Sequence, residues 1–148
     1  MLIARLLADV CSRNPFVKSI EYSNNKLEDI EIAGPALEMF SYHTSPYPWE
    51  HLESVAVTNS CATPDAGDYV CEWLCGYAGF DGCGEYPRSS IVKVDLSSNH
   101  ITGASTIGSG HYLPDAISQN NGMQVLNLSD NLLDDTEAGL IAEALRKN

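Results

Sequence analysis

Pairs of apolar residues two positions apart recur four times along the chain, and polar residues flank each pair. Residues two apart point to the same side of a β-strand, so each pair predicts a strand with one buried and one polar side. The pairs are Ile20 and Tyr22, Val55 and Val57, Val94 and Leu96, and Leu126 and Leu128. We therefore expect strands near residues 17–23, 52–58, 91–97 and 123–129.

An asparagine stands three residues after the second apolar residue in three of these segments, as Asn25, Asn99 and Asn131. An asparagine side chain can hydrogen-bond backbone groups of a turn that would otherwise be buried without partners, so each predicts a closed turn. The second segment carries Ser60 at this position, followed by Cys61. A one-residue bulge would let Cys61 take over the asparagine's role there.

Helical patterns and loops separate the predicted strands. After the last strand, Asp134 is a good helix start, apolar residues recur at helical spacing, and Arg146 suits the negative end of a helix. Further helices are expected within residues 2–10, 36–40, 64–76 and 113–118. The stretch from Gly76 to Ser90 holds four glycines and a proline, which predicts a loop inserted before the third strand.

The last segment matches L-x-x-L-x-L-x-x-N-x-L, the pattern of a leucine-rich repeat, with Met123, Leu126, Leu128, Asn131 and Leu133 at the five positions. Its return segment is a full helix, so the chain resembles the ribonuclease-inhibitor-like subfamily of leucine-rich repeat proteins. That resemblance implies an α/β solenoid, a curved right-handed stack with a parallel concave sheet and with helices and loops on the convex side. A single domain over residues 1–148 would hold a partial repeat, 1–16, and four repeats, 17–51, 52–90, 91–122 and 123–148.

Composition limits which binding partners and which cellular location we expect. The chain has 148 residues and a formal charge of −12, which repels phosphate backbones and anionic membrane surfaces. It also has no apolar run long enough to cross a bilayer and no signal-peptide layout at its start. We expect a cytoplasmic protein that binds neither nucleic acid nor membranes.

The cysteines and histidines invite a zinc or redox interpretation that their spacing does not favour. Five cysteines are an odd number and fit reduced thiols, although a disulfide between Cys75 and Cys83 is sterically conceivable. Zinc sites favour closely spaced pairs such as C-x2-C, whereas Cys71 and Cys75 are one helical turn apart. We expect no metal and no cofactor. The chain also lacks the G-x-S-x-G, phosphate-loop and H-E-x-x-H patterns, so we expect no enzyme.

The outward strand positions form the usual binding face of this family, by resemblance. Here that row is small, polar and mildly acidic, and an ordinary solvated surface explains it equally well because it lacks aromatic and arginine anchors. The candidate protein-binding residues are Lys18, Glu21, Ser23, Glu53, Thr58, Lys93, Asp95, Ser97, Gln124, Asn127 and Ser129.

These observations favour a protein-protein interaction module or scaffold. The alternative is a regulator of a small GTPase, resembling leucine-rich GTPase-activating proteins, and a third possibility is a metal- or redox-sensing domain built on the cysteine loop. A further expectation concerns the two ends of the stack of repeats, because terminal repeats need a polar outer side. We expect apolar residues at both ends to contact further repeats or other chains, namely Leu2, Leu6 and Leu7 at one end and Leu126, Leu128, Ile141 and Leu145 at the other.

Overall fold

The computed structural model describes residues 14, 16–26, 52–77, 90–104, 112–120 and 122–148, with the backbone alone for 72–77 and 119. The expected helices at 2–10 and 36–40, and most of the expected loop after Gly76, lie outside the described residues. The described elements are β1 (Ser19–Ser23), β2 (Ser54–Thr58), α3 (Pro64–Tyr77), β3 (Lys93–Asp95), α4 (Tyr112–Gln119), β4 (Val125–Asn127) and α5 (Asp135–Lys147).

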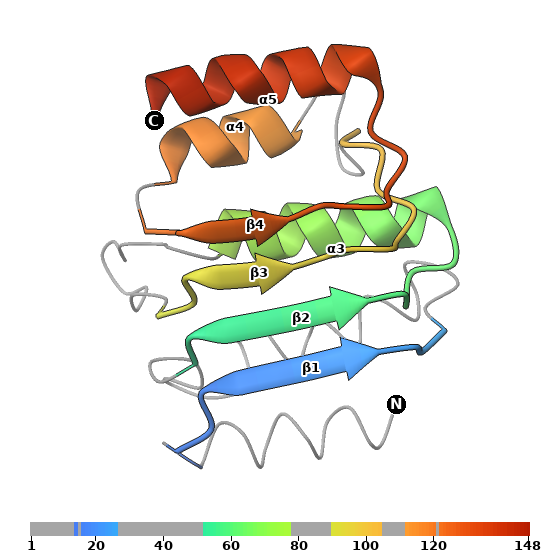
Figure 1. Cartoon of the computed structure of the whole chain (residues 1–148), viewed down its shortest axis with the longest axis vertical. Coiled ribbons are helices and arrows are strands. Elements are labelled where there is room, and N and C mark those ends of the chain that lie inside the picture. Colours follow the sequence, from blue (N-terminus) through green and yellow to red (C-terminus); the bar gives the residue numbers. More distant parts are fainter. Residues whose placement is uncertain (1–13, 15, 27–51, 78–89, 105–111, 121) are drawn as a thin grey trace.

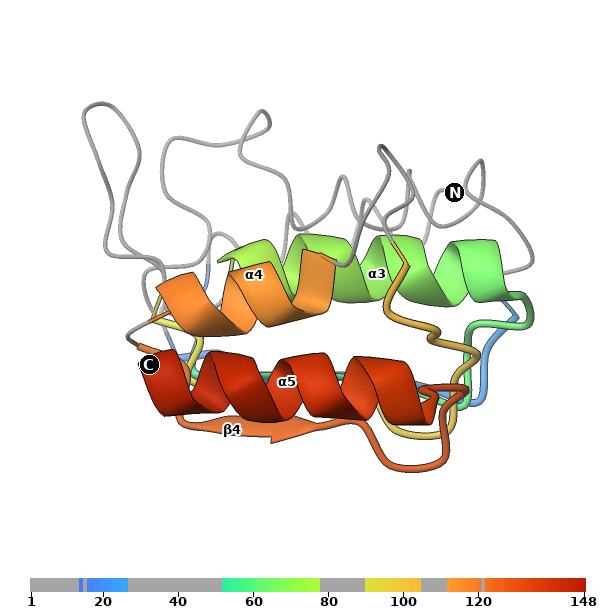
Figure 2. The ribbon, with the colours of Figure 1, turned by 90° about the horizontal axis from the view of Figure 1, so that it is seen from above.

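The four strands form one parallel sheet in the order β1-β2-β3-β4 (Figure 1). Helices α3, α4 and α5 lie on one side of this sheet, and α4 packs against both of the other helices (Figure 2). The arrangement is mixed α/β, and it confirms the four expected strands and their parallel direction. The strands are shorter than expected, and α3 continues through Tyr77, one residue past Gly76 where the loop was expected to begin.

The apolar pairs of the middle strands form the core. Val55 and Val94 are 0% and 1% exposed, and Leu96 is fully buried. The corresponding apolar pairs of the outer strands are only partly buried: Ile20 and Tyr22 in β1, and Leu126 and Leu128 in β4. A strand inside the stack is covered by a neighbour on each side, whereas an edge strand is covered on one side, so burial falls from the middle of the sheet to its edges.

Asn99 joins the turn after β2 to the turn after β3. Its side-chain oxygen accepts hydrogen bonds from the backbone N–H of Ser60 at 3.0 Å and of Cys61 at 2.9 Å, while its amide donates to the carbonyls of Val57 at 2.7 Å and Leu96 at 2.9 Å. Asn131 repeats this arrangement one strand later, accepting from Ile101 and donating to Leu96. Asn99 is buried, as expected, but Asn131 is only half-buried because it stands at the open edge of the sheet.

The expectation that Cys61 would replace the missing asparagine is wrong. The hydroxyl of Ser60 takes the role itself, donating toward the carbonyls of Tyr22 (3.2 Å) and Thr58 (2.9 Å) and accepting from the N–H of Asn25 at 3.3 Å. Cys61 instead points into the core and is 3% exposed. A hydroxyl both donates and accepts, which a thiol does only weakly. The asparagine ladder therefore consists of Asn25, Ser60, Asn99 and Asn131.

A left-handed backbone residue precedes each member of the ladder. The φ angles are 56° at Asn24, 46° at Asn59, 58° at Ser98 and 56° at Asp130. Asparagine and aspartate tolerate this region better than other residues with a side chain, since their short polar groups bond locally. The same turn thus recurs four times, and each time a ladder residue follows the left-handed residue.

Helices α3 and α5 begin as their sequences indicate. The hydroxyl of Thr63 accepts a hydrogen bond from the N–H of Ala66 at 3.3 Å, just before Pro64 opens α3. Asp134 caps α5 by accepting from the N–H of Glu137 at 2.8 Å. These caps satisfy N–H groups that a helix start leaves without partners.

Helix α3 is also held against the segment that follows β3. Asp68 is buried, and its carboxylate accepts hydrogen bonds from the N–H groups of Thr102 at 2.7 Å and Gly103 at 2.9 Å, and from the Thr102 hydroxyl. One helical position earlier, Gly67 allows this approach, because a Cβ atom there would lie 3.0 Å from the carbonyl carbon of His100 and 3.1 Å from the nitrogen of Ile101.

Replacing Asn99 by alanine should lower the free energy of unfolding by about 3 kcal/mol, because it leaves several buried backbone groups without partners at about 1–3 kcal/mol each. Asn25→Ala is the matched control, since Asn25 holds the equivalent position but is exposed, and it should cost less than about 1 kcal/mol. Urea unfolding measures both. Similar midpoints for the two variants would contradict the ladder.

Two glycine substitutions in helices should have opposite effects. A Cβ atom added at Gly139 of α5 would meet no other atom within 4 Å, so Gly139→Ala should stabilise the protein by up to about 1 kcal/mol through helix propensity. Gly67→Ala should instead destabilise it by about 1 kcal/mol or more, because the new methyl group presses on backbone. Thermal unfolding of both variants tests this, and stabilisation by both would show that α3 packs less tightly than described.

Candidate interaction face

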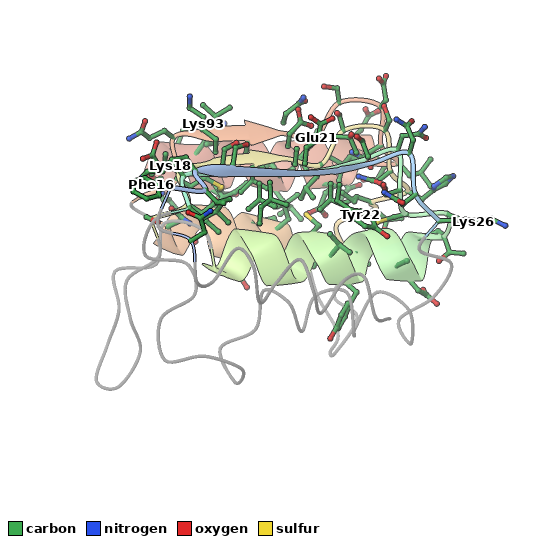
Figure 3. All side chains as sticks on the ribbon, turned by 90° about the horizontal axis from the view of Figure 1, so that it is seen from below. Phe16, Lys18, Glu21, Tyr22, Lys26 and Lys93 are labelled. Atoms are coloured by element: carbon green, nitrogen blue, oxygen red, sulfur yellow. The ribbon has the colours of Figure 1, made fainter. Side chains whose placement is uncertain are left out.

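The sheet has one side free of the described helices, and the outward side chains of β1 to β4 form what we call the open face. In β1, Glu21 lies on this side, whereas Tyr22 points toward the helices (Figure 3). Phe16, Lys18 and Lys93 gather at the end of the sheet where the strands begin, and Lys26 lies at the opposite end (Figure 3). The open face therefore has two ends of different composition.

Strand register arranges the open face in rows that run across the sheet. The first row is Ser19, Ser54, Lys93 and Val125, and the second is Glu21, Ala56, Asp95 and Asn127. Ser23 and Thr58 begin a third row, which Ser97 and Ser129 continue just past β3 and β4. Lys18, Glu53 and Gln124 lie one residue before their strands. All eleven candidate residues thus lie on this face or at its rim.

Asp95, Ser97, Asn127 and Ser129 form a connected polar network on this face. One carboxylate oxygen of Asp95 accepts from the backbone N–H of Ser97 at 2.9 Å and from its hydroxyl at 2.7 Å, and the other accepts from the amide of Asn127 at 3.0 Å. The side-chain oxygen of Asn127 in turn accepts from the N–H of Ser129 at 3.1 Å and from its hydroxyl. Each side chain is held in place by its neighbours before any partner arrives.

The same network sets the charge state of Asp95. Partial burial alone would raise the pKa of its carboxyl group, but the hydrogen bonds from Ser97 and Asn127 outweigh burial and lower the pKa below its ordinary value. Asp95 is therefore a fixed negative charge at neutral pH. In the second row it lies beside Ala56, whose short side chain stands between Asp95 and Glu21.

The end of the sheet where the strands begin carries Lys18, Lys93 and the most exposed aromatic side chain among the described residues. Phe16 is 88% exposed. Lys18 pairs with Glu53 at 3.2 Å, and both side chains are more than half exposed, so the pair contributes little to stability. No sequence pattern indicated Phe16 as a surface residue, because it stands directly before the first expected strand.

A second surface feature lies at the β4 edge of the sheet. A groove of about 260 Å³ opens between β4 and the ends of α4 and α5. Its lining residues are Ile117, Asn120, Met123, Gln124, Val125, Leu126, Leu128, Ile141, Leu145 and Asn148. The sequence anticipated Leu126, Leu128, Ile141 and Leu145 as partly covered, and it missed Ile117 and Met123.

The described cysteines are poor candidates for metal or redox chemistry. Cys61 and Cys71 are buried and form no disulfide, and burial raises the pKa of the Cys61 thiol to about 12. A thiol with so high a pKa stays protonated and is a weak nucleophile and metal ligand. Within the described ranges, no three His, Cys, Asp or Glu side chains gather as a metal site would require. Cys83 and the side chain of Cys75 lie outside them.

Comparisons with known proteins show the fold. No protein-family model matches the chain, and no curated protein sequence matches it. The chain is similar to a solved structure, Leiomodin-1 Actin-Binding Site 2, with a TM-score of 0.63 and 18% identity over 99% of this chain and 72% of that one. That structure is leucine-rich-repeat-like. The shared fold is therefore one that carries a protein-binding site in another protein. A fold alone does not determine function, which depends on the residues at particular sites.

The helices give one further result about the kind of protein this is. Among the residues that the structure describes, none of the helices combines the length and the apolar composition that crossing a lipid bilayer demands.

Asp95 should titrate below the usual aspartate pKa of about 3.9, and Asn127→Ala should raise that pKa toward it by removing one hydrogen bond. Because the pKa is lowered in the folded state, the ionised carboxylate stabilises the protein above the unfolded-state pKa, and this stabilisation is lost as pH falls through the folded-state pKa. NMR titration of the carboxyl carbon measures the pKa in both proteins. An unchanged value in Asn127→Ala would show that the hydrogen bond does not form in solution.

Proposed function

We propose that this chain is a protein-interaction module that binds a protein partner across its open face and has no catalytic activity of its own. The observation that carries the proposal is the preformed network of Asp95, Ser97, Asn127 and Ser129, repeated in register on neighbouring strands. Side chains already held in one geometry lose little further freedom when a partner binds, so their hydrogen bonds contribute more of their strength to affinity.

The charge of the chain defines the kind of surface that this face would bind. A formal charge of −12, together with Glu21 and the ionised Asp95 in the second row, favours a partner that presents basic side chains. Ala56 leaves room between these two carboxylates for an incoming lysine or arginine. Phe16, Lys18 and Lys93 at the strand-start end would contact a separate, less basic part of the same partner.

The similarity to Leiomodin-1 Actin-Binding Site 2 supports this proposal and makes actin the first partner to test. It also supports a cytoplasmic location, where actin is found. We propose further that the parallel sheet belongs to a curved leucine-rich repeat solenoid of the ribonuclease-inhibitor-like type, with the open face on its concave side. The recurring turn and the ladder support that arrangement. Regulation of a small GTPase remains the alternative, and it rests on the repeat type and the acidity alone.

A photo-crosslinking amino acid placed at Ala56 should capture a protein partner, with purified actin as the first probe. The matched control is Ala142, an exposed alanine on α5, far from the open face. We expect crosslinking from position 56 that exceeds that from position 142 at least about 10-fold and that weakens at high salt, as screening of charge complementarity requires. Mass spectrometry of crosslinks formed in native extract then covers partners other than actin, and a GTPase among them would favour the alternative.

Equal crosslinking of the same partner from both positions would place binding away from the open face and contradict the proposal. Crosslinking of another protein from position 56, with none to actin, would retain the face and reject actin.

A further inference from the structure

The edge of β4 lacks the contacts that every other described boundary between strands in this sheet has. At the start of each strand, one carbonyl accepts hydrogen bonds from two successive N–H groups of the following repeat. The carbonyl of Lys18 accepts from residues 53 and 54 at 2.9 and 3.1 Å, that of Glu53 from residues 92 and 93 at 3.0 and 3.2 Å, and that of Val92 from residues 124 and 125 at 2.8 and 3.1 Å. The next carbonyl in this series belongs to Gln124, and no described residue donates to it.

The turns at the other end of the strands repeat a second hydrogen bond. The N–H of the left-handed residue donates to a carbonyl of the following repeat, from Asn24 to Thr58 at 3.1 Å, from Asn59 to Ser97 at 3.2 Å and from Ser98 to Ser129 at 2.9 Å. Asp130 is the next left-handed residue, with φ at 56°. Its N–H points from the same turn, and no described residue accepts from it.

The ladder supplies a third contact of this kind. The last three ladder side chains each donate to a carbonyl of the preceding segment, from Ser60 to Tyr22, from Asn99 to Val57 and from Asn131 to Leu96. The carbonyl of Leu96 accepts from both Asn99 and Asn131, each at 2.9 Å. The corresponding carbonyl of Leu128 accepts from Asn131 at 3.0 Å, so one place for a donor is open.

Apolar surface accompanies these three backbone groups. The groove beside β4 is lined by Leu126, Leu128, Ile141 and Leu145, and Leu145 is 62% exposed. In the middle strands, the residues equivalent to Leu126 and Leu128 are no more than 2% exposed, because the next repeat covers them. Polar backbone groups in register with an apolar groove therefore fit one particular kind of occupant.

We propose that the β4 edge and its groove bind a strand-turn-helix unit of leucine-rich repeat chemistry supplied by a partner protein. The contacts repeated at the three boundaries between neighbouring strands of the sheet specify the contacts that the bound unit would make. Its strand runs parallel to β4, places two N–H groups on the carbonyl of Gln124 and receives the N–H of Asp130. Two apolar residues, two positions apart, pack on Leu126 and Leu128, and an asparagine three residues further on donates to the carbonyl of Leu128.

The helix of the occupant then covers the outer part of the groove, over Ile141 and Leu145. This surface lies at the edge of the sheet, whereas the proposed function uses the open face. An experiment that contradicts one proposal therefore does not contradict the other. Strand addition to an exposed sheet edge is an established way for one protein to bind another, with the backbone giving affinity and side-chain pockets giving specificity.

The probe for this inference is a synthetic peptide with the sequence of residues 123–148, which contains a strand, a ladder asparagine and a helix in the required order. Fluorescence anisotropy of the labelled peptide, titrated with the full chain, should show saturable binding. The same peptide carrying Asn131→Ala should bind at least about 10-fold more weakly, since one ladder hydrogen bond to the carbonyl of Leu128 is lost and that site is left unfilled.

A pair of leucine substitutions in the protein locates the binding surface. Leu145→Glu places a charge in the groove and should weaken peptide binding at least about 10-fold. Leu132→Glu is the matched control, because Leu132 is similarly exposed, at 52%, but does not line the groove, and it should leave affinity within about 2-fold. Circular dichroism of both variants checks that they fold.

Three outcomes would overturn the inference. The first is no saturable binding of the peptide, and the second is equal weakening by Leu145→Glu and Leu132→Glu. The third is self-association of the full chain in sedimentation equilibrium that Leu145→Glu abolishes, because a second copy of this chain, not a partner protein, would then occupy the groove.

Discussion

Satisfying the backbone polar groups that lie buried between neighbouring turns is the constraint on which this structure depends. A parallel sheet pairs the groups along its strands, but the chain must leave each strand through a turn packed against the next turn, where strand pairing has ended. Asn99 resolves this by serving four backbone groups from two repeats at once. The register of the open face follows from it, since fixing the turns fixes which residues stand side by side in each row.

The same constraint explains where the molecule is well covered and where it is not. The strands of this sheet bury their apolar residues against neighbouring strands, so Val55 and Val94 in the middle are fully enclosed while Leu126 at the edge is half covered. Mostly polar side chains occupy the open face, and apolar side chains line the groove at the β4 edge. The protein therefore presents two chemically different surfaces: one suits a charged, hydrated partner and the other a structurally similar one.

The sequence allowed the strands, their polar and apolar sides, the three ladder asparagines and the helix starts to be predicted, because each depends on residues close together in the chain. The asparagine's role in the second segment was assigned wrongly to Cys61, since the hydrogen bond that gives this role to Ser60 depends on how near the carbonyl of Tyr22 comes to it from another segment. The contacts of Asp68 with Thr102, and the close approach at Gly67, were not predicted for the same reason. The network around Asp95 was foreseen as a set of outward residues, but its hydrogen bonds depend on the register between β3 and β4.

The long reach of the ladder also bears on how the chain folds. The hydrogen bonds of Ser60 and Asn99 to the preceding strand join residues 38 and 42 positions apart, so each requires a long loop to close before it contributes any energy. Proteins dominated by such distant pairings fold slowly, because the entropy of loop closure is lost before contacts compensate for it. During synthesis, the edge of each β-strand stays uncovered until the next strand has been made. The folding of a newly made chain would therefore depend on the order in which its strands emerge.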